Sequence, residues 1–223
     1  MITLHHLEYS QSFRVLWLLE ELGIDYEVKV YQRDKKTMLA PDEYKALSPL
    51  GTAPVITDGD VILAETSAIL DYIIDQNSND QLRPSPSSEN RVNYLFWSHA
   101  SQGSLMPTAL FGMLFRIMET RVPFFLKPMV KMISAGAKQG FINPRMSAIL
   151  LQAEADLEQA DFFAGDDLTL ADILMSYPLD ALASRDDLKD YPNCQSWLER
   201  IKARPAYQSA LEKDGKDSVI LQL

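Results

Sequence analysis

The sequence predicts an α/β domain followed by an all-helical domain. Strand-like and helical patterns alternate over the first 77 residues, which is typical of an α/β fold. A stretch rich in Ser, Pro and Asn follows, and no convincing strand pattern comes after it. We therefore predict a first domain at residues 1–80, a linker at 81–88 and an all-helical domain at 89–223.

The chain begins with the pattern of a strand, a helix and a second strand. Residues 2–7 are an apolar-rich run, and residues 15–22 carry apolar side chains at helical spacing. Gly23 stands where a helix commonly ends, and residues 26–30 alternate apolar with charged side chains. Two strands joined through a helix are expected to run parallel.

The rest of the N-terminal part completes the order βαβαββα. Residues 34–48 have a weak helical pattern, and apolar residues on both sides of a turn at 58–60 predict a hairpin of two short strands. A clear helix begins at Thr66. Beyond the linker, helical patterns cover residues 94–105, 150–158 and 194–201, and another helix opens at Thr169.

Composition and charge exclude several classes of function. The 223 residues carry a net charge of -10, so an acidic surface would repel the phosphate backbone of a nucleic acid. One cysteine allows no intramolecular disulfide, and the N-terminus has no apolar core of signal-peptide length. The longest uncharged stretch, residues 92–115, contains several polar side chains and does not predict a membrane span. We expect a cytoplasmic protein.

Two segments of the first domain have features of a ligand site. Pro54 stands between a turn and an apolar strand, where a cis bond would expose the backbone of the preceding residue; an ordinary turn proline is the alternative. Glu65 and Thr66 stand where a strand ends and a helix begins. The helix N-terminus can bind a carboxylate and Glu65 can pair with an ammonium group, although a plain N-cap is the alternative.

A third segment, Tyr9-Ser10-Gln11-Ser12, lies between the first strand and the first helix. A hydroxyl there can donate a hydrogen bond to a bound thiolate. Such a bond contributes about 1.5–3 kcal/mol, and each unit of thiol pKa depression needs about 1.4 kcal/mol. The alternative is that Ser10 or Ser12 simply caps the helix.

The histidines show no metal-ligand spacing. His5 and His6 are adjacent on a predicted strand, so their side chains face opposite ways, and His99 lies far along the chain. We therefore predict no metal site.

The three segments around Ser10, Pro54 and Glu65, in this order and spacing, strongly resemble the glutathione-binding half of cytosolic glutathione transferases. The matching segments are SQSFRVLWLLEELGIDYE, SPLGTAPVI and LAETSAILDYI, and the helical half adds LTLADILM and IKARPAYQSAL. These segments are most similar in sequence to those of bacterial and fungal members of the family. The resemblance covers nearly the whole chain and implies a thioredoxin-like N-terminal domain, with a helical-bundle C-terminal domain that forms the second-substrate pocket.

The resemblance implies a role for each residue of the three segments. Ser10 is the first choice to activate the glutathione thiol, with Ser12 and Tyr9 as rivals. The remaining contacts to glutathione are expected from Thr52, Ala53, Pro54, Glu65, Thr66 and Gln102. Ala53 would pair its backbone with the cysteinyl part, Pro54 would be cis, and Gln102 would reach across a dimer interface.

Two departures from the family pattern qualify this assignment. Many relatives have Lys where Thr52 stands, so the contact that this lysine makes to glutathione is expected to be absent. The familiar Glu-Ser pair is Glu-Thr here, which keeps the hydroxyl. No cysteine lies near the first helix, which argues against the branches that perform thiol–disulfide exchange, and Cys194 is expected to be buried packing.

The C-terminal part carries a predicted capping box and a predicted apolar pocket. Thr169 is expected to cap a helix whose third residue is Asp172, a structural motif. Residues 104–142 are rich in Met and Phe, and we assign Phe13, Met106 and Phe111 to the second-substrate pocket. Helix core with a basic outer face is the alternative, and contact with a membrane surface is a third interpretation.

The predicted function is conjugation of the glutathione thiolate to an apolar electrophile, for detoxification. Glutathione is the co-substrate, and a homodimer without nucleic-acid partners is expected. The alternatives are glutathione-dependent reduction of peroxides or disulfides, and a non-catalytic protein that binds glutathione or another ligand. The sequence does not identify the physiological electrophile.

Overall fold

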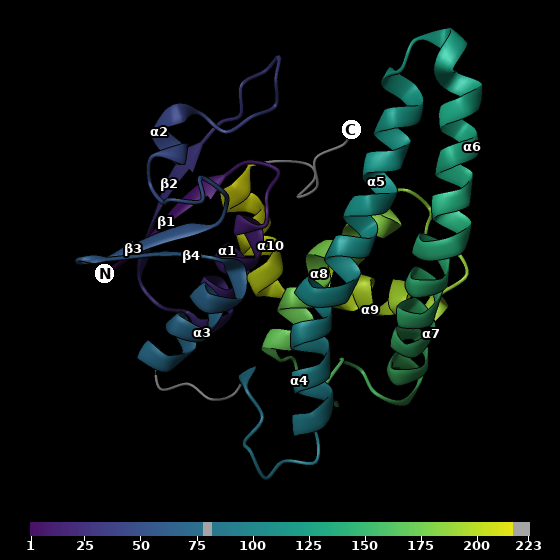
Figure 1. Ribbon diagram of the computed structural model, residues 1–223. Coiled ribbons are helices and arrows are strands. Elements are labelled where there is room, and N and C mark those ends of the chain that lie inside the picture. The colour runs from purple at the N-terminus through teal and green to yellow at the C-terminus, as the bar shows by residue number, and fades with distance from the viewer. Residues whose placement is uncertain (78–81, 216–223) are drawn as a thin grey trace.

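The computed structural model describes residues 1–77 and 82–215. A four-stranded sheet with helices on both faces forms the first part, and long helices form the second (Figure 1). The predicted fold class is thereby confirmed. Residue 81 of the predicted linker lies outside the described residues, as do residues 78–80 and 216–223 of the two predicted domains.

The N-terminal part follows the predicted order of elements. They are β1 (Ile2–Leu7), α1 (Ser12–Leu22), β2 (Tyr26–Tyr31), α2 (Asp42–Lys45), β3 (Val55–Asp58), β4 (Val61–Ala64) and α3 (Thr66–Asn77). The strand order is β2-β1-β3-β4, with β1 parallel to β2 and antiparallel to β3. The central strand β1 therefore positions whatever follows its carboxyl end.

The two faces of the sheet bury different sets of side chains, because residues alternate along β1. Leu4 faces the main core together with α1 and α3, whereas Leu7 packs with Tyr31 and Tyr44 on the opposite face, beneath α2. Helix α1 is buried over eight consecutive residues from Ser12 to Leu19, because it is enclosed by the sheet and by helices of the second part.

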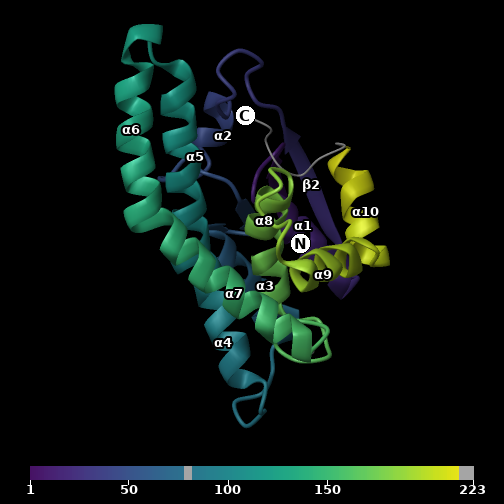
Figure 2. The ribbon, with the colours of Figure 1, turned by 90° about the vertical axis from the view of Figure 1, so that its right-hand side faces the viewer.

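The C-terminal part is helical throughout residues 91–214, apart from short connections. Its elements are α4 (Arg91–Ala100), the π-helical turn η2 (Ser101–Leu105), α5 (Met106–Arg121), the short 3-10 turn η3 (Phe124–Leu126), α6 (Lys127–Ala137), the π-helical turn η4 (Lys138–Ile142), α7 (Asn143–Gln159), α8 (Leu170–Ala183), α9 (Pro192–Lys202) and α10 (Pro205–Asp214). The long α5–α6 pair extends away from the sheet (Figure 2).

The predicted capping box organises the core of this part. Asp172 is fully buried, and its carboxylate accepts hydrogen bonds from the backbone N–H and the hydroxyl of Thr169, both at 2.9 Å. It also accepts from the backbone N–H of Phe163 at 2.9 Å and from the indole Nε1 of Trp197 at 3.0 Å. Burial raises the pKa of Asp172, while these four donors act in the opposite direction.

Helix α10 packs beside α1 rather than among the other C-terminal helices (Figure 1). Arg204, just before α10, forms a two-bond contact with the carboxylate of Glu21 at 2.6 and 2.9 Å. Asp214 at the end of α10 contacts His6 of β1 at 2.5 Å. The last described helix thus returns to the N-terminal part and closes one side of it.

Candidate active site

The turn after β1 lies beside the Ala53–Pro54 peptide bond. Val55, the first residue of β3, pairs with His5 of β1 in antiparallel register. Continuing that register by two residues places Ala53 beside Leu7, the last residue of β1. The Ala53–Pro54 bond is cis, which confirms the expectation for Pro54. The backbone of Ala53 therefore lies next to the turn that leads into α1.

Glu65 and Thr66 come to the same edge of the sheet. Val55 also pairs with Ala64, so the following residue, Glu65, lies beside Pro54. Glu65 is exposed and has a φ of 76°, while Thr66 is buried as the first residue of α3. The first N–H groups of a helix lack partners within the helix and carry a partial positive charge. A carboxylate can therefore bind at the N-terminus of α3, and an ammonium group can pair with Glu65.

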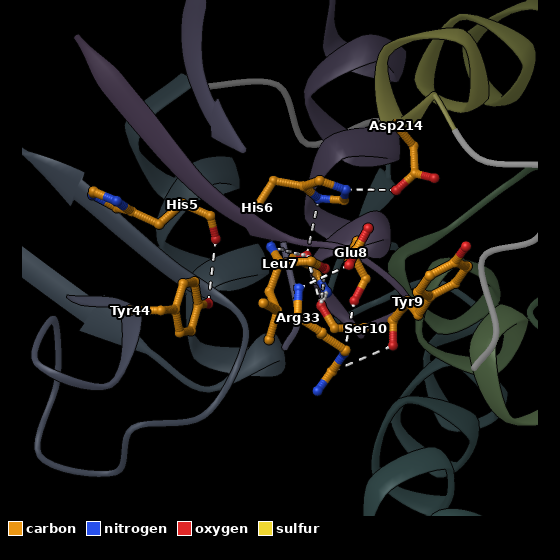
Figure 3. Close-up of polar contacts among 10 residues, drawn as sticks. His5, His6, Leu7, Glu8, Tyr9, Ser10, Arg33, Tyr44 and Asp214 are labelled. Carbon is orange, nitrogen blue, oxygen red and sulfur yellow. Dashed lines mark hydrogen bonds and ion pairs between the residues drawn. The ribbon is translucent and has the colours of Figure 1, made fainter. Parts of the chain in front are cut away.

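The three predicted hydroxyl donors lie in different surroundings, and Figure 3 labels two of them, Tyr9 and Ser10. Ser10 Oγ donates to the carbonyl oxygen of Leu7 at 2.6 Å and lies 2.8 Å from Ser12 Oγ. Ser12 is fully buried, and its hydroxyl lies 2.9 Å from His6 Nδ1. Tyr9 has a φ of 52° and is only half-buried. Of the two serines, Ser10 is the one nearer the surface.

Gln11 connects the elements around this edge, and the sequence interpretation assigned it no role. Its Oε1 accepts a hydrogen bond from the hydroxyl of Thr66 at 3.4 Å and another from Gln102 Nε2 at 3.3 Å. It also accepts from the guanidinium of Arg14. Gln102, expected to reach across a dimer interface, therefore contacts Gln11, just before α1, in its own subunit. Thr52 is exposed.

Arg14 is a fully buried cation beneath the same edge, also missed from the sequence. Its guanidinium donates to the carbonyl oxygen of Leu174 at 2.8 Å and to the hydroxyl of Thr66 at 3.2 Å, and lies 5.5 Å from the centre of the Tyr177 ring. No carboxylate of residues 1–77 or 82–215 forms an ion pair with it. Burial accordingly lowers the pKa of Arg14 to about 9.

The chain matches two family models and has close relatives. Residues 10–76 match the N-terminal domain of glutathione S-transferases, and residues 117–205 match the C-terminal domain. Glutathione S-transferase 3 of Schizosaccharomyces pombe is 35% identical over 96% of this chain and 88% of its own length. The chain belongs to the glutathione S-transferase family. The resemblance inferred from its motifs is confirmed, and the protein is a glutathione transferase enzyme.

Other relatives agree with the family assignment. Glutathione S-transferase 1 of Saccharomyces cerevisiae is 29% identical over 96% of this chain and 95% of its own length. A solved glutathione S-transferase of Actinobacillus pleuropneumoniae is 34% identical, with a TM-score of 0.79 over 96% of this chain and 93% of its own. The match extends across both parts of this glutathione transferase.

An apolar hollow of about 220 Å³ lies next to the serine turn. Its walls include Tyr9, Arg33, Met106, Leu110, Met113 and Tyr177. The structure does not bring the three predicted pocket residues together. Phe13 is buried against the ring of Tyr207, and Phe111 lines a different hollow with Phe96 and Phe141. Of the three, Met106 alone lies in the hollow beside the turn. A sequence rich in Met and Phe does not show which neighbour covers each side chain, so the pocket assignment stays a prediction.

The remaining candidate groups of this transferase lie apart from the edge. Cys194 is fully buried in α9, and burial raises the pKa of its thiol far above the usual range, in agreement with a packing role. In the described ranges, no three His, Cys, Asp or Glu side chains gather where a metal ion could bind. No helix within those ranges is both long and apolar enough to cross a membrane.

Proposed function

We propose that the carboxyl edge of β1 binds glutathione and that Ser10 holds its thiol as a thiolate. The observation that carries this proposal is the convergence of the serine turn, the Ala53–Pro54 backbone and the start of α3 at one edge of the sheet. Family membership supports glutathione as the ligand.

The charged groups of glutathione are matched to groups of opposite charge at this edge of the sheet. The γ-glutamyl ammonium group lies near Glu65, and its carboxylate accepts from Thr66 and the N-terminus of α3. The cysteinyl part pairs with the backbone of Ala53, beside the cis bond to Pro54. We also propose Thr52 and Gln102 as further contacts to glutathione.

Ser10 is the preferred donor to the thiolate, because Ser12 is fully buried and its hydroxyl is 2.9 Å from His6 Nδ1. A donor to a charged acceptor contributes about 1.5–3 kcal/mol, which corresponds to a fall of about one to two units in the thiol pKa. The thiolate attacks an apolar electrophile in the hollow lined by Tyr9 and Met106. A soft, Met-containing wall adapts to differently shaped substrates.

Ser10→Ala is expected to lower conjugation turnover about tenfold at pH 6.5 with saturating glutathione, because the bound thiol would then be mostly protonated. The measurement is the rate of conjugate formation with an activated aryl halide. Turnover should recover at pH 9, where the thiol ionises without help. Equal turnover at pH 6.5 in Ser10→Ala would contradict the assignment, and Ser12→Ala and Tyr9→Phe would then be tested.

The same assay separates conjugation from the other candidate activities. Peroxide consumption that exceeds conjugation with every electrophile tried would favour glutathione-dependent reduction. Binding of glutathione without either reaction would favour a non-catalytic binding protein.

We further propose a homodimer that works in the cytoplasm in detoxification. Helix α4 exposes Val92, Leu95 and Phe96, an apolar surface that suits a two-fold interface. Light scattering at assay concentrations is expected to give twice the mass of 25.2 kDa of the chain. A stable monomer under those conditions would contradict the dimer.

A further inference from the structure

A buried row of four side chains connects the end of α10 to the serine turn. Figure 3 labels three of them, Asp214, His6 and Ser10. Asp214 Oδ1 lies 2.5 Å from His6 Nε2, and His6 Nδ1 lies 2.9 Å from Ser12 Oγ. Ser12 Oγ in turn lies 2.8 Å from Ser10 Oγ. We call Asp214, His6, Ser12 and Ser10 the buried relay. It is continuous from the C-terminal helix to the hydroxyl assigned to the thiol.

The Ser10 end is the least buried part of the relay. The side chains of His6 and Asp214 are each 1% exposed, and Ser12 is 0% exposed as a residue, whereas Ser10 is 6% exposed. Among the described residues, Asp214 Oδ2 has no hydrogen-bond partner. A buried carboxylate with so few donors is stabilised most when the imidazole beside it carries a positive charge. The inner end is therefore suited to receive a proton.

The direction of each hydrogen bond follows from Asp214. A carboxylate only accepts, so a neutral His6 must carry its proton on Nε2 and donate it to Asp214. His6 Nδ1 then accepts from the hydroxyl of Ser12. Ser10 directs its own hydrogen inward, toward Ser12 Oγ or the carbonyl oxygen of Leu7. In this state Ser10 presents an acceptor, not a donor, to a bound thiol.

We propose that His6, held by Asp214, accepts the proton of the glutathione thiol through the hydroxyls of Ser10 and Ser12. This inference rests on the proposed function. The S–H bond breaks and its proton passes to Ser10 Oγ, while the Ser10 proton passes to Ser12 Oγ and the Ser12 proton to His6 Nδ1. The products are a thiolate and an imidazolium paired with Asp214, so no charge is created or lost in the protein–ligand complex.

The transfer reverses the two hydrogen bonds between His6 and Ser10, while His6 Nε2 still donates to Asp214. His6 Nδ1 now donates to Ser12, and Ser12 donates to Ser10, which leaves the hydrogen of Ser10 directed at the thiolate. This is the polarity that stabilises the negative sulfur. After the thiolate has attacked, the proton returns along the same hydroxyls to the leaving group or to solvent.

Helix α10 brings two further titratable groups near Asp214, Tyr207 and the adjacent Lys213, and Lys213 is paired with Glu20 of α1. Burial raises the pKa of the Tyr207 hydroxyl far above its usual range, and the charges of Asp180 and Asp214 act in the same direction. Tyr207 therefore stays protonated over the pH range of the assay and does not compete with His6 for the thiol proton.

The first test counts protons. Glutathione is added to the wild-type protein in weakly buffered solution at pH 7, with a pH indicator for released protons and ultraviolet absorbance for the thiolate formed. The relay predicts much less than one proton released per thiolate, because His6 keeps it. Release of one proton per thiolate would overturn the proposal. Absence of glutathione binding would instead overturn the proposed function, so the two failures are distinguishable.

The second test uses variants that keep the shape of the relay. Asp214→Asn removes the negative charge that stabilises a protonated His6, while its amide oxygen can still accept from His6 Nε2. The pH midpoint of the thiolate band is expected to rise by at least one unit in Asp214→Asn and in His6→Gln. Proton release in both should approach one per thiolate.

His5→Gln is the matched control, because His5 lies next to His6 but faces away and contacts Tyr31 and Thr57. Its thiolate midpoint should equal that of wild type. Thermal unfolding with bound glutathione verifies that each variant is folded. A folded Asp214→Asn protein with an unchanged midpoint would show that the four side chains only join α10 to β1.

Discussion

Replacing Asp172 with alanine is expected to lower the free energy of unfolding by about 3–5 kcal/mol. The carboxylate is the common acceptor for four donors that come from Phe163, Thr169 and Trp197. A lost helix cap costs about 1 kcal/mol, and each donor left without its charged acceptor adds to that cost. Because all these donors are buried, water does not replace the carboxylate.

Urea unfolding measures this loss, and two variants calibrate it. Asp166→Ala changes an exposed aspartate nearby and should shift the unfolding free energy by less than about 0.5 kcal/mol. Thr169→Ala removes one of the four donors and should cost about 1–2 kcal/mol. A loss below about 1 kcal/mol in Asp172→Ala would mean that the capping box does not organise this core.

Arg14→Met is expected to weaken glutathione binding about a hundredfold without lowering the stability of the free protein. The guanidinium is within 3.2 Å of Thr66 Oγ1, and a carboxylate bonded to that hydroxyl would lie about 6 Å from the cation. At an effective dielectric constant of about 20, this attraction is about 3 kcal/mol, or roughly a hundredfold in affinity.

The stability of the free protein should not fall, because the charge of Arg14 is buried without a carboxylate partner in the described part of the chain. A buried charge replaced by an apolar side chain of similar volume is often neutral or stabilising. The carbonyl oxygen of Leu174 keeps a donor, since the hydroxyl of Ser101 lies 2.7 Å from it. Arg14 would thus be an example of stability given up for ligand binding.

Calorimetric titration with glutathione, together with thermal unfolding of the free protein, measures both effects. Arg14→Lys keeps a charge and is expected to bind more tightly than Arg14→Met. If Arg14→Met binds glutathione like wild type, the cation beneath the site does not contribute to ligand affinity.

The sequence predicted the elements because their patterns are local. The strand at residues 2–7, the hairpin after Pro54 and the helix from Thr66 each show their own periodicity, and all three are present. The capping box was predictable for the same reason, since Thr169 and Asp172 are three residues apart.

The contacts between distant segments were not predictable in the same way. No local pattern pairs His6 with Asp214, which are 208 positions apart. Phe13 was assigned to the second-substrate pocket, but the return of α10 covers it with Tyr207. Arg14, in contrast, was recognisable in the sequence, because it is a charged residue inside the apolar run SFRVLWLL. A charged residue is rarely fully buried, so this position indicates a functional or structural role.

The most direct test of the central claim is the ultraviolet difference spectrum of bound glutathione, followed across pH in wild type and in Ser10→Ala. A thiolate band that forms well below the pKa of a free thiol, about 8.5, and moves upward by one to two units in the variant is the predicted result. An identical band in both proteins would contradict the role of Ser10, and no binding in wild type would contradict the glutathione site itself.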